Sequence, residues 1–314
     1  MKEGKTGYRW VIICAVLAVA LLGAMMTGCS DQKAGSDSGS GNAEPQTETS
    51  SVENEKSTAE DADVEDLVVS WDESWQYADY SKIHSSDVTL YRAQKSRKDV
   101  TVALNAGHGT SGGSSVKTLC HPDKTPKVVS GSTAAGETTA AAVSEGTTML
   151  DGSPERDVTL ALALTAKEVL LDTGYDVLMI RETEDVQLDN IARTVIANNY
   201  ADCHIALHYD YTENDKGLFY IDVPDVASYR NMEPVASHWQ EHHALGEAIL
   251  SGMRDKNVKI YGDGTLAIDL TQTSYSTIPS IDLEVGDRAS DVSQSTLENL
   301  SEGMVEGLDQ FFSK

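Results

Sequence analysis

Basic residues are scarce in this sequence. Of its 314 residues, 24 are lysine or arginine and 50 are aspartate or glutamate, so the formal net charge at pH 7 is −26. A protein that binds nucleic acid needs lysine and arginine to neutralise phosphates, so we expect no nucleic acid partner. The same charge argues against capture of an anionic lipid or polymer through bulk electrostatic attraction.

Cysteine is also rare, and the sequence has no phosphate-binding loop. Four cysteines are too few for a fold built on disulfides. Cys120 and Cys203 could pair in an oxidising compartment, but the sequence does not decide this. We find no phosphate-binding loop of the Gly-x4-Gly-Lys-Ser/Thr type. Enzymes that depend on that loop are therefore not expected.

The N-terminus has the pattern of an export signal. Three basic residues, Lys2, Lys5 and Arg9, precede an uncharged run that ends at Gly28, directly before Cys29. Residues 1–28 resemble a bacterial lipoprotein signal peptide, after which the cysteine is lipidated and becomes the new N-terminus. We therefore expect an exported protein held at the cell membrane by a lipid on Cys29. An uncleaved anchor and an ordinary thiol are the alternatives.

Two segments separate this signal from the folded domain. Residues 29–66 are polar and acidic and contain no aromatic residue, which is typical of a disordered tether. Its root-mean-square reach would be roughly 35 Å. Residues 67–98 contain five aromatic residues and are expected to form a linker, a small appendage or a segment packed on the domain edge. These aromatic residues are Trp71, Trp75, Tyr77, Tyr80 and Tyr91.

Residues 99–314 alternate between strand and helix patterns. Hydrophobicity with a period of two, or short apolar runs, predicts strands over 100–104, 175–180, 202–208, 217–223, 265–270 and 280–285. Helical periodicity predicts helices over 154–173, 188–196, 245–253 and 297–311, the first with Ser153 as its N-cap. This alternation indicates a three-layer α/β domain with a mostly parallel central sheet flanked by helices.

The segment 110–152, between the first strand and the first helix, is of low complexity. Serine, threonine, glycine and alanine dominate it. We expect a long loop that is a lid, an inhibitory segment or an inert insertion. Its composition favours an inert or disordered insertion.

Four side chains that suit metal-dependent hydrolysis are expected at one edge of the sheet, because ligand sites cluster where parallel strands end. His108 follows the first strand, His208 ends the third, Glu284 lies near the end of the last, and Glu155 opens a helix. Two histidines and a carboxylate form a catalytic zinc set with one position open for water. Glu284 would carry the proton from water to the leaving nitrogen.

Each of these residues also has an ordinary interpretation. His108 could be a turn residue, His208 a core residue and Glu155 a charge that stabilises a helix N-terminus. His238 and His242 have metal-binding spacing on a helix, but a solvated helix face is the simpler interpretation. Arg181 and Arg193, two further polar residues of this region, are expected to form structural ion pairs.

Four motifs in order resemble those of the amidase-3 family of zinc-dependent N-acetylmuramoyl-L-alanine amidases. They are Val100 to Gly109 with its Gly-His-Gly turn, Glu155 at a helix start, Arg193 with Ala197-Asn198 and Ala206-Leu207-His208, and Pro279, Ile281 and Leu283 with Glu284-Val285-Gly286. The segment Ile180-Arg181 to Asp185 fits between them. Four positions depart from the family pattern, namely Thr159, Ala206, Asp210 and Asp287.

The resemblance implies a Zn²⁺ hydrolase that cuts the amide between N-acetylmuramic acid and L-alanine in peptidoglycan. Carried over by position, His108, Glu155 and His208 would bind zinc and Glu284 would be the catalytic carboxylate. The protein would face the cell wall with peptidoglycan as its substrate. The altered positions leave two alternatives open, a wall-binding lipoprotein without turnover and a zinc hydrolase of another amide or peptide.

Overall fold

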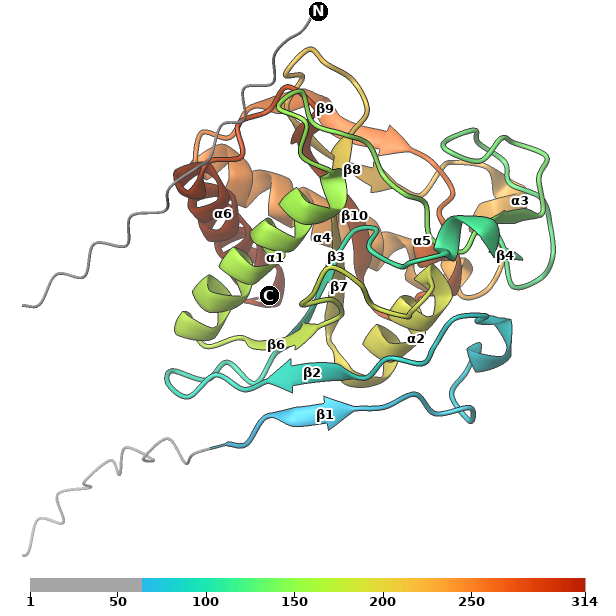
Figure 1. Ribbon diagram of the computed structural model, residues 1–314, viewed down its shortest axis with the longest axis horizontal. Helices are drawn as coiled ribbons and strands as arrows, with labels where there is room; N and C mark the ends of the chain where they lie inside the picture. The colour runs from blue at the N-terminus through green and yellow to red at the C-terminus, as the bar shows by residue number, and fades with distance from the viewer. Residues whose placement is uncertain (1–63, 314) are drawn as a thin grey trace, which may run out of the picture. The chain divides into compact units, whose positions relative to one another are not determined.

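The computed structural model describes residues 64–313 (Figure 1). The expected signal peptide, Cys29 and nearly all of the expected tether lie outside the described residues. Within residues 64–313, no helix is both long enough and apolar enough to cross a membrane.

An eight-stranded sheet forms the middle layer, in the order β1-β2-β6-β3-β7-β10-β8-β9. The central strands β6, β3, β7 and β10 are parallel to one another, whereas β2 and β8 join them antiparallel. The mostly parallel sheet expected from the sequence is therefore confirmed. The strands are β1 (Leu67–Val69), β2 (Val88–Tyr91), β3 (Thr101–Ala106), β6 (Asp176–Met179), β7 (Cys203–Asp210), β8 (Leu218–Asp222), β9 (Ile260–Ala267) and β10 (Ser280–Asp287).

Two strands lie upstream of the expected domain boundary at residue 99. β1 pairs with β2 and β2 pairs with β6, so residues 67–98 extend the central sheet and are not a separate linker or appendage. Their aromatic side chains pack onto the domain, and the Tyr77 and Tyr80 rings each lie 5.5 Å from the Tyr275 ring. The strand β9 also begins five residues earlier than the pattern at 265–270 predicted.

Helices cover both faces of the sheet. Helices α1 (Glu155–Asp172), α4 (Val235–Asp255) and α6 (Gln294–Phe312) lie on one face and share a hydrophobic cluster with Val102 and Leu104 of β3. Helix α2 (Asn190–Tyr200) packs on the other, against Ala103 of the same strand. Neighbouring side chains of β3 therefore enter different layers, as expected for a buried parallel strand.

Shorter elements complete the domain. They are α3 (Ala227–Arg230), α5 (Thr271–Tyr275) and two 3₁₀ turns, η1 (Ala78–Tyr80) and η2 (Gly113–Ser115). The start of α1 differs slightly from expectation. Pro154 is the N-cap, and neither it nor Ser153 caps the helix with a side-chain hydrogen bond.

The 110–152 segment is ordered, so the expectation of disorder is wrong. It contains η2 and an antiparallel strand pair, β4 (Lys117–Leu119) with β5 (Thr139–Ala141). A buried carboxylate, Asp269, anchors the segment to the chain after β9. Its Oδ2 accepts from His121 Nε2 at 2.9 Å and from the Val128 amide at 2.8 Å. Composition hides this order because the groups that hold the segment are distant in the sequence, including the Asn190 amide, which donates to the Ala142 carbonyl at 3.1 Å.

Candidate metal centre

Strand register places His208 and Glu284 side by side. β7 and β10 pair in parallel, with Glu284 opposite His208. The preceding residues, Leu207 and Leu283, point into the core beneath α1, α4 and α6. By strand alternation, His208 and Glu284 therefore point to the opposite face of the sheet. The parallel pairing of β7 with β10 therefore makes His208 and Glu284 neighbours.

His108 reaches the same point from a tight turn after β3. Its backbone has a φ of 65°, in the left-handed region. The preceding glycine is required by space, since a Cβ on Gly107 would lie 2.3 Å from Cε1 of His208. The Gly107 amide also donates to the Leu207 carbonyl at 3.0 Å, which ties the turn to β7.

Glu155 enters the site from the first residue of α1. Its Oε1 accepts from the Tyr209 amide at 3.1 Å, and its Oε2 accepts from the Thr147 amide at 2.7 Å. These bonds fix the carboxylate between the sheet and the end of the 110–152 segment. The helix N-terminus adds a favourable dipole for a negative charge.

The three predicted ligands converge. His108 Nε2 lies 2.8 Å from Glu155 Oε1, His208 Nδ1 lies 3.1 Å from the same oxygen, and the two nitrogens are 3.0 Å apart. Ligand atoms around a tetrahedral ion with bonds of about 2.0–2.1 Å are separated by about 3.3 Å. A triangle of this size, made of two imidazoles and a carboxylate, fits Zn²⁺.

Hydrogen bonds outside this triangle orient the rings. His108 Nδ1 donates to the Ser144 carbonyl at 2.8 Å, which turns Nε2 toward the site as the nitrogen that could bind a metal. On His208 the outward nitrogen, Nε2, faces Asp282, whose Oδ2 is 3.9 Å away. Ser144 belongs to the 110–152 segment, so that segment helps to position a ligand.

The charges of the site favour a cation. Burial raises the pKa of Glu155, but hydrogen bonds from His108 and His208 outweigh it and hold the pKa well below the ordinary range. Burial lowers the pKa of His208, but Asp282, Glu155 and Glu284 raise it to about 10. A positive charge is therefore stabilised here, and a divalent ion would replace that proton on binding.

The surroundings of Glu284 change the acidity of its carboxyl group. Burial and the charge of Asp282 raise the pKa of its carboxyl well above the ordinary value. Its Oε2 is buried and has no hydrogen-bond partner among residues 64–313. A carboxyl group with a raised pKa and a free oxygen beside a metal site can accept and return a proton.

Two buried arginines differ from their expected role. Arg181 and Arg193 form no ion pair within the described part of the chain. Arg181 donates to the carbonyls of Ala106 and Gly107, and Arg193 donates to those of Ala106 and His108. Both therefore support the turn that carries His108, but through neutral acceptors.

Asp282 and Ser144 contribute to the site and were missed by the sequence reasoning. Asp282 is two residues from Glu284 on the same strand, so the period of two was the signal that could have found it. The side chain of Ser144 carries no motif, and its contact runs mainly through the backbone. Of the positions that depart from the family pattern, Thr159 donates to the Gly107 carbonyl at 3.1 Å, so it also supports the turn.

Other candidates lie apart from this centre. His242 is buried and accepts from the Ser280 amide at 3.0 Å, so it is not on a solvated face and forms no metal pair with His238. His238 instead pairs with Glu241. Cys120 and Cys203 are both buried as free thiols.

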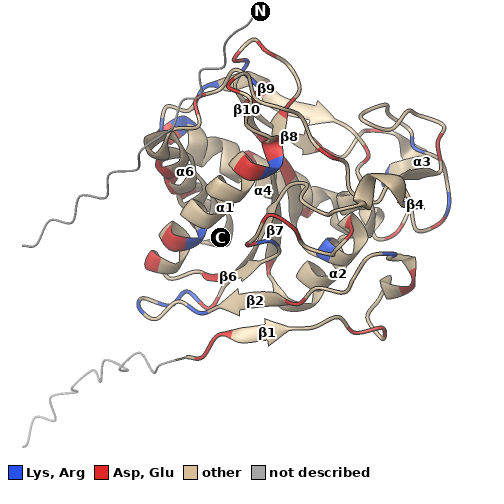
Figure 2. Cartoon of the chain, in the orientation of Figure 1, with Lys and Arg blue, Asp and Glu red and all other residues tan. Residues whose placement is uncertain are grey.

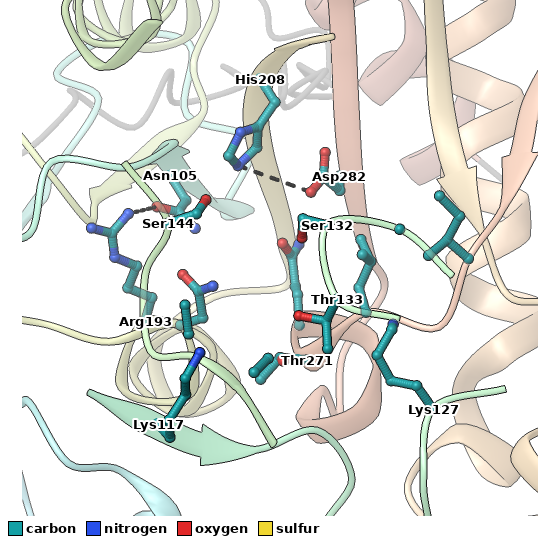
Figure 3. A pocket seen from close by; sticks show the side chains of 17 residues that line it. Asn105, Lys117, Lys127, Ser132, Thr133, Ser144, Arg193, His208, Thr271 and Asp282 are labelled. Atoms are coloured by element: carbon teal, nitrogen blue, oxygen red, sulfur yellow. Dashed lines mark hydrogen bonds and ion pairs between the residues drawn. The ribbon is translucent and has the colours of Figure 1, made fainter. Parts of the chain in front are cut away.

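A cavity of about 210 Å³ adjoins the centre on the α2 face of the sheet (Figure 3). His208 and Asp282 border it on the metal side. Residues of the 110–152 segment, including Lys117, Ser132 and Thr133, form much of the remaining wall.

Comparisons with known proteins agree with this architecture. The chain superposes on the N-acetylmuramyl-L-alanine amidase Ami1 of Mycobacterium smegmatis with a TM-score of 0.56 and 15% identity, covering 68% of this chain and 97% of that one. The apo form of Ami1 from Mycobacterium abscessus gives a TM-score of 0.53 at 16% identity, covering 68% and 98%. These similarities confirm the three-layer fold. A search of curated proteins gives no match.

The family comparison covers most of the folded domain. A model described as N-acetylmuramoyl-L-alanine amidase matches residues 102–307, which include His108, Glu155, His208 and Glu284. The match spans more than half of the chain, and its bounds run from the first central strand to the last helix. The chain therefore belongs to the amidase-3 family of N-acetylmuramoyl-L-alanine amidases.

Proposed function

We propose that this protein is a zinc-dependent N-acetylmuramoyl-L-alanine amidase that hydrolyses the amide between N-acetylmuramic acid and L-alanine in peptidoglycan. The observation that carries the proposal is the convergence of His108, Glu155 and His208 within 3.1 Å of one another, next to Glu284. Family membership supports the choice of substrate.

His108, Glu155 and His208 would hold the ion. A bound Zn²⁺ supplies a Lewis acid that polarises the amide carbonyl and lowers the pKa of water to about 7. The residues of the chain do the rest. Ser144 keeps the His108 ring in the tautomer that leaves Nε2 free, and the amides of Tyr209 and Thr147 hold Glu155.

Glu284 performs the proton transfers. Its carboxylate accepts a proton from the attacking water and returns it to the nitrogen of L-alanine, which otherwise leaves poorly as an amide anion. The raised pKa of the carboxyl helps it to hold the proton between the two transfers. Asp282 contributes to that raised pKa through its charge.

Digestion of purified peptidoglycan tests the proposal. The zinc-loaded protein should release new L-alanine amino termini, and a chelator should abolish the release until zinc is restored. Glu284→Gln should keep zinc but lose turnover by about 10³-fold. Glu302→Gln, which changes the same charge on the exposed side of α6, is the matched control.

Two outcomes would point elsewhere. Stoichiometric zinc with no hydrolysis at any pH from 5 to 9 would support the alternative of a wall-binding protein without turnover. Hydrolysis that leaves the muramoyl amide intact but cuts another bond would support a different amide or peptide substrate. Mass spectrometry of the products separates these cases.

We also propose that the chain is exported and anchored to the membrane by a lipid on Cys29, facing the cell wall. The proposal rests on the sequence of residues 1–29, which end in Thr27-Gly28-Cys29. Replacement of Cys29 by alanine should abolish the lipid-modified N-terminus seen by mass spectrometry of the wild type. An unmodified Cys29 in the wild-type protein would refute the anchor.

A further inference from the structure

The cavity beside the metal centre has cationic side chains in its wall, which is unusual for this protein. Figure 2 shows acidic residues spread over the strands, helices and loops, with fewer basic ones among them. Yet Lys117, Lys127 and Arg193 all border the one cavity. In a protein with a large negative net charge, such a local positive charge favours an anionic ligand at this cavity over the rest of the surface.

The three cations differ in how far their donors are already used. Arg193 gives all of its donors to neutral groups, which are three carbonyls, the Asn105 amide oxygen and the Thr110 hydroxyl. Lys127 is buried and its ammonium binds the Asp269 carbonyl, with the Asp269 carboxylate 3.4 Å away. Arg193 therefore adds charge to the cavity but has no donor left for a ligand, and Lys127 is already held by the backbone carbonyl and the carboxylate of Asp269.

Lys117 is different. It lies on β4, is exposed, and makes no hydrogen bond or ion pair with any residue between 64 and 313. Its side chain points toward the cavity (Figure 3). An ammonium with three unused donors at the wall of a cavity is suited to a carboxylate.

The cavity extends from this ammonium to His208, one of the three predicted ligands. His208 and Asp282 border its metal side, while Lys117 borders it from the 110–152 segment, and Figure 3 shows them at opposite sides of the space. Small polar side chains, including Ser132, Thr133 and Thr271, line the wall between them. A short peptide that extends from the amide at the metal can occupy this space and reach the lysine.

We propose that this cavity binds the peptide side of the substrate and that Lys117 recognises a carboxylate on that peptide. The proposal rests on the proposed amidase function, which sets the peptide as the leaving group. It gives the 110–152 segment a role in selecting substrates with an acidic stem peptide over substrates in which that carboxyl group is amidated.

Two substrates that differ only in that group test the proposal. They are N-acetylmuramoyl-L-alanyl-D-glutamate, with a free α-carboxylate, and N-acetylmuramoyl-L-alanyl-D-isoglutamine, its amide. The zinc-loaded wild type should prefer the first by about tenfold in kcat/KM. Lys117→Gln should reduce the preference to about twofold or less, with little change for the amide substrate.

Matched variants exclude a general charge effect. Lys124 is an exposed lysine of the same segment that does not border the cavity, so Lys124→Gln should leave the preference unchanged. Lys117→Arg keeps the positive charge and should retain most of the preference for the acidic substrate. A preference unaffected by Lys117→Gln, or lost equally in Lys124→Gln, would overturn the proposal.

A binding measurement separates this proposal from the proposed function. Calorimetry with the zinc-loaded protein compares L-alanyl-D-glutamate with L-alanyl-D-isoglutamine, the two leaving peptides, and needs no turnover. Tighter binding of the acid by wild type, lost in Lys117→Gln, supports the subsite even if no amide is cut. Equal binding of both peptides by the wild type overturns the subsite, whether or not the protein is an amidase.

Discussion

Two buried histidines should make the protein sensitive to mild acid. His204 on β7 and His242 on α4 are nearly inaccessible to solvent, at 0% and 2% exposure. Burial, followed by the charge of Arg193, lowers the pKa of His204 to about 3, and burial followed by His238 lowers that of His242 to about 3. Both rings are therefore neutral in the folded protein near neutral pH.

The free energy of unfolding depends on pH because these two rings have a lower pKa in the folded protein than in the unfolded chain. Above the unfolded pKa of 6.5, the rings are neutral in both states and pH has no effect through them. Below it, only the unfolded chain takes up protons, so stability is lost as pH falls toward the folded pKa. Each ring should lower the free energy of unfolding by about 2 kcal/mol between pH 7.5 and pH 5, because each pH unit below the unfolded pKa is worth about 1.4 kcal/mol.

The variant His204→Leu isolates this effect. Both ring nitrogens of His204 lack a hydrogen-bond partner among the described residues, so an apolar side chain of similar size leaves no new group unsatisfied. The free energy of unfolding, measured with urea from pH 7.5 to pH 5, should fall by about 2 kcal/mol less in His204→Leu than in wild type.

His238→Gln is the matched control, since His238 lies one turn from His242 on α4 but is partly exposed and paired with Glu241. Its curve of stability against pH should follow that of wild type. If wild type and His204→Leu lose stability in parallel over this range, the buried ring is already protonated in the folded state and the reasoning is wrong.

Three further substitutions probe the packing. Gly107→Ala would put a methyl group 2.3 Å from the His208 ring, so zinc affinity in a chelator competition should fall at least about tenfold while circular dichroism stays native. Asp269→Asn removes the charge that anchors the 110–152 segment, so unfolding should cost about 3 kcal/mol less and proteolysis should begin in that segment. Gly252→Ala would put a Cβ 2.3 Å from the Gly303 carbonyl where α4 crosses α6, so the melting curve should show a loss of about 2 kcal/mol. An unchanged zinc affinity, proteolysis pattern or melting temperature would count against the corresponding contact.

Local patterns predicted the central sheet and the metal residues. The alternation at 100–104 and 202–208 placed His108 and His208 at the ends of two strands. Parallel pairing of β3 with β7 then brings those two ends to the same edge of the sheet. These predictions succeeded because a parallel sheet converts local periodicity into shared edges. Glu155, the third predicted ligand, was proposed from its helix start and the resemblance to a known family, and its side chain lies with the two histidines.

Features that depend on distant contacts were not predicted. The 110–152 segment has the composition of a disordered loop, and its order depends on a hydrogen-bond network around Asp269, far along the chain. Arg193 was expected to need a carboxylate, but carbonyls of a turn satisfy it. In both cases the partner is a long-range contact that no local pattern encodes.

The 110–152 segment begins and ends at the metal centre. His108 precedes it, Glu155 follows it, and its last residues hold both ligands through Ser144 and the Thr147 amide. The two ends of the segment therefore lie at the same set of side chains. The middle of the segment lines the adjoining cavity, so changes there can alter substrate preference while the residues at its two ends stay in place.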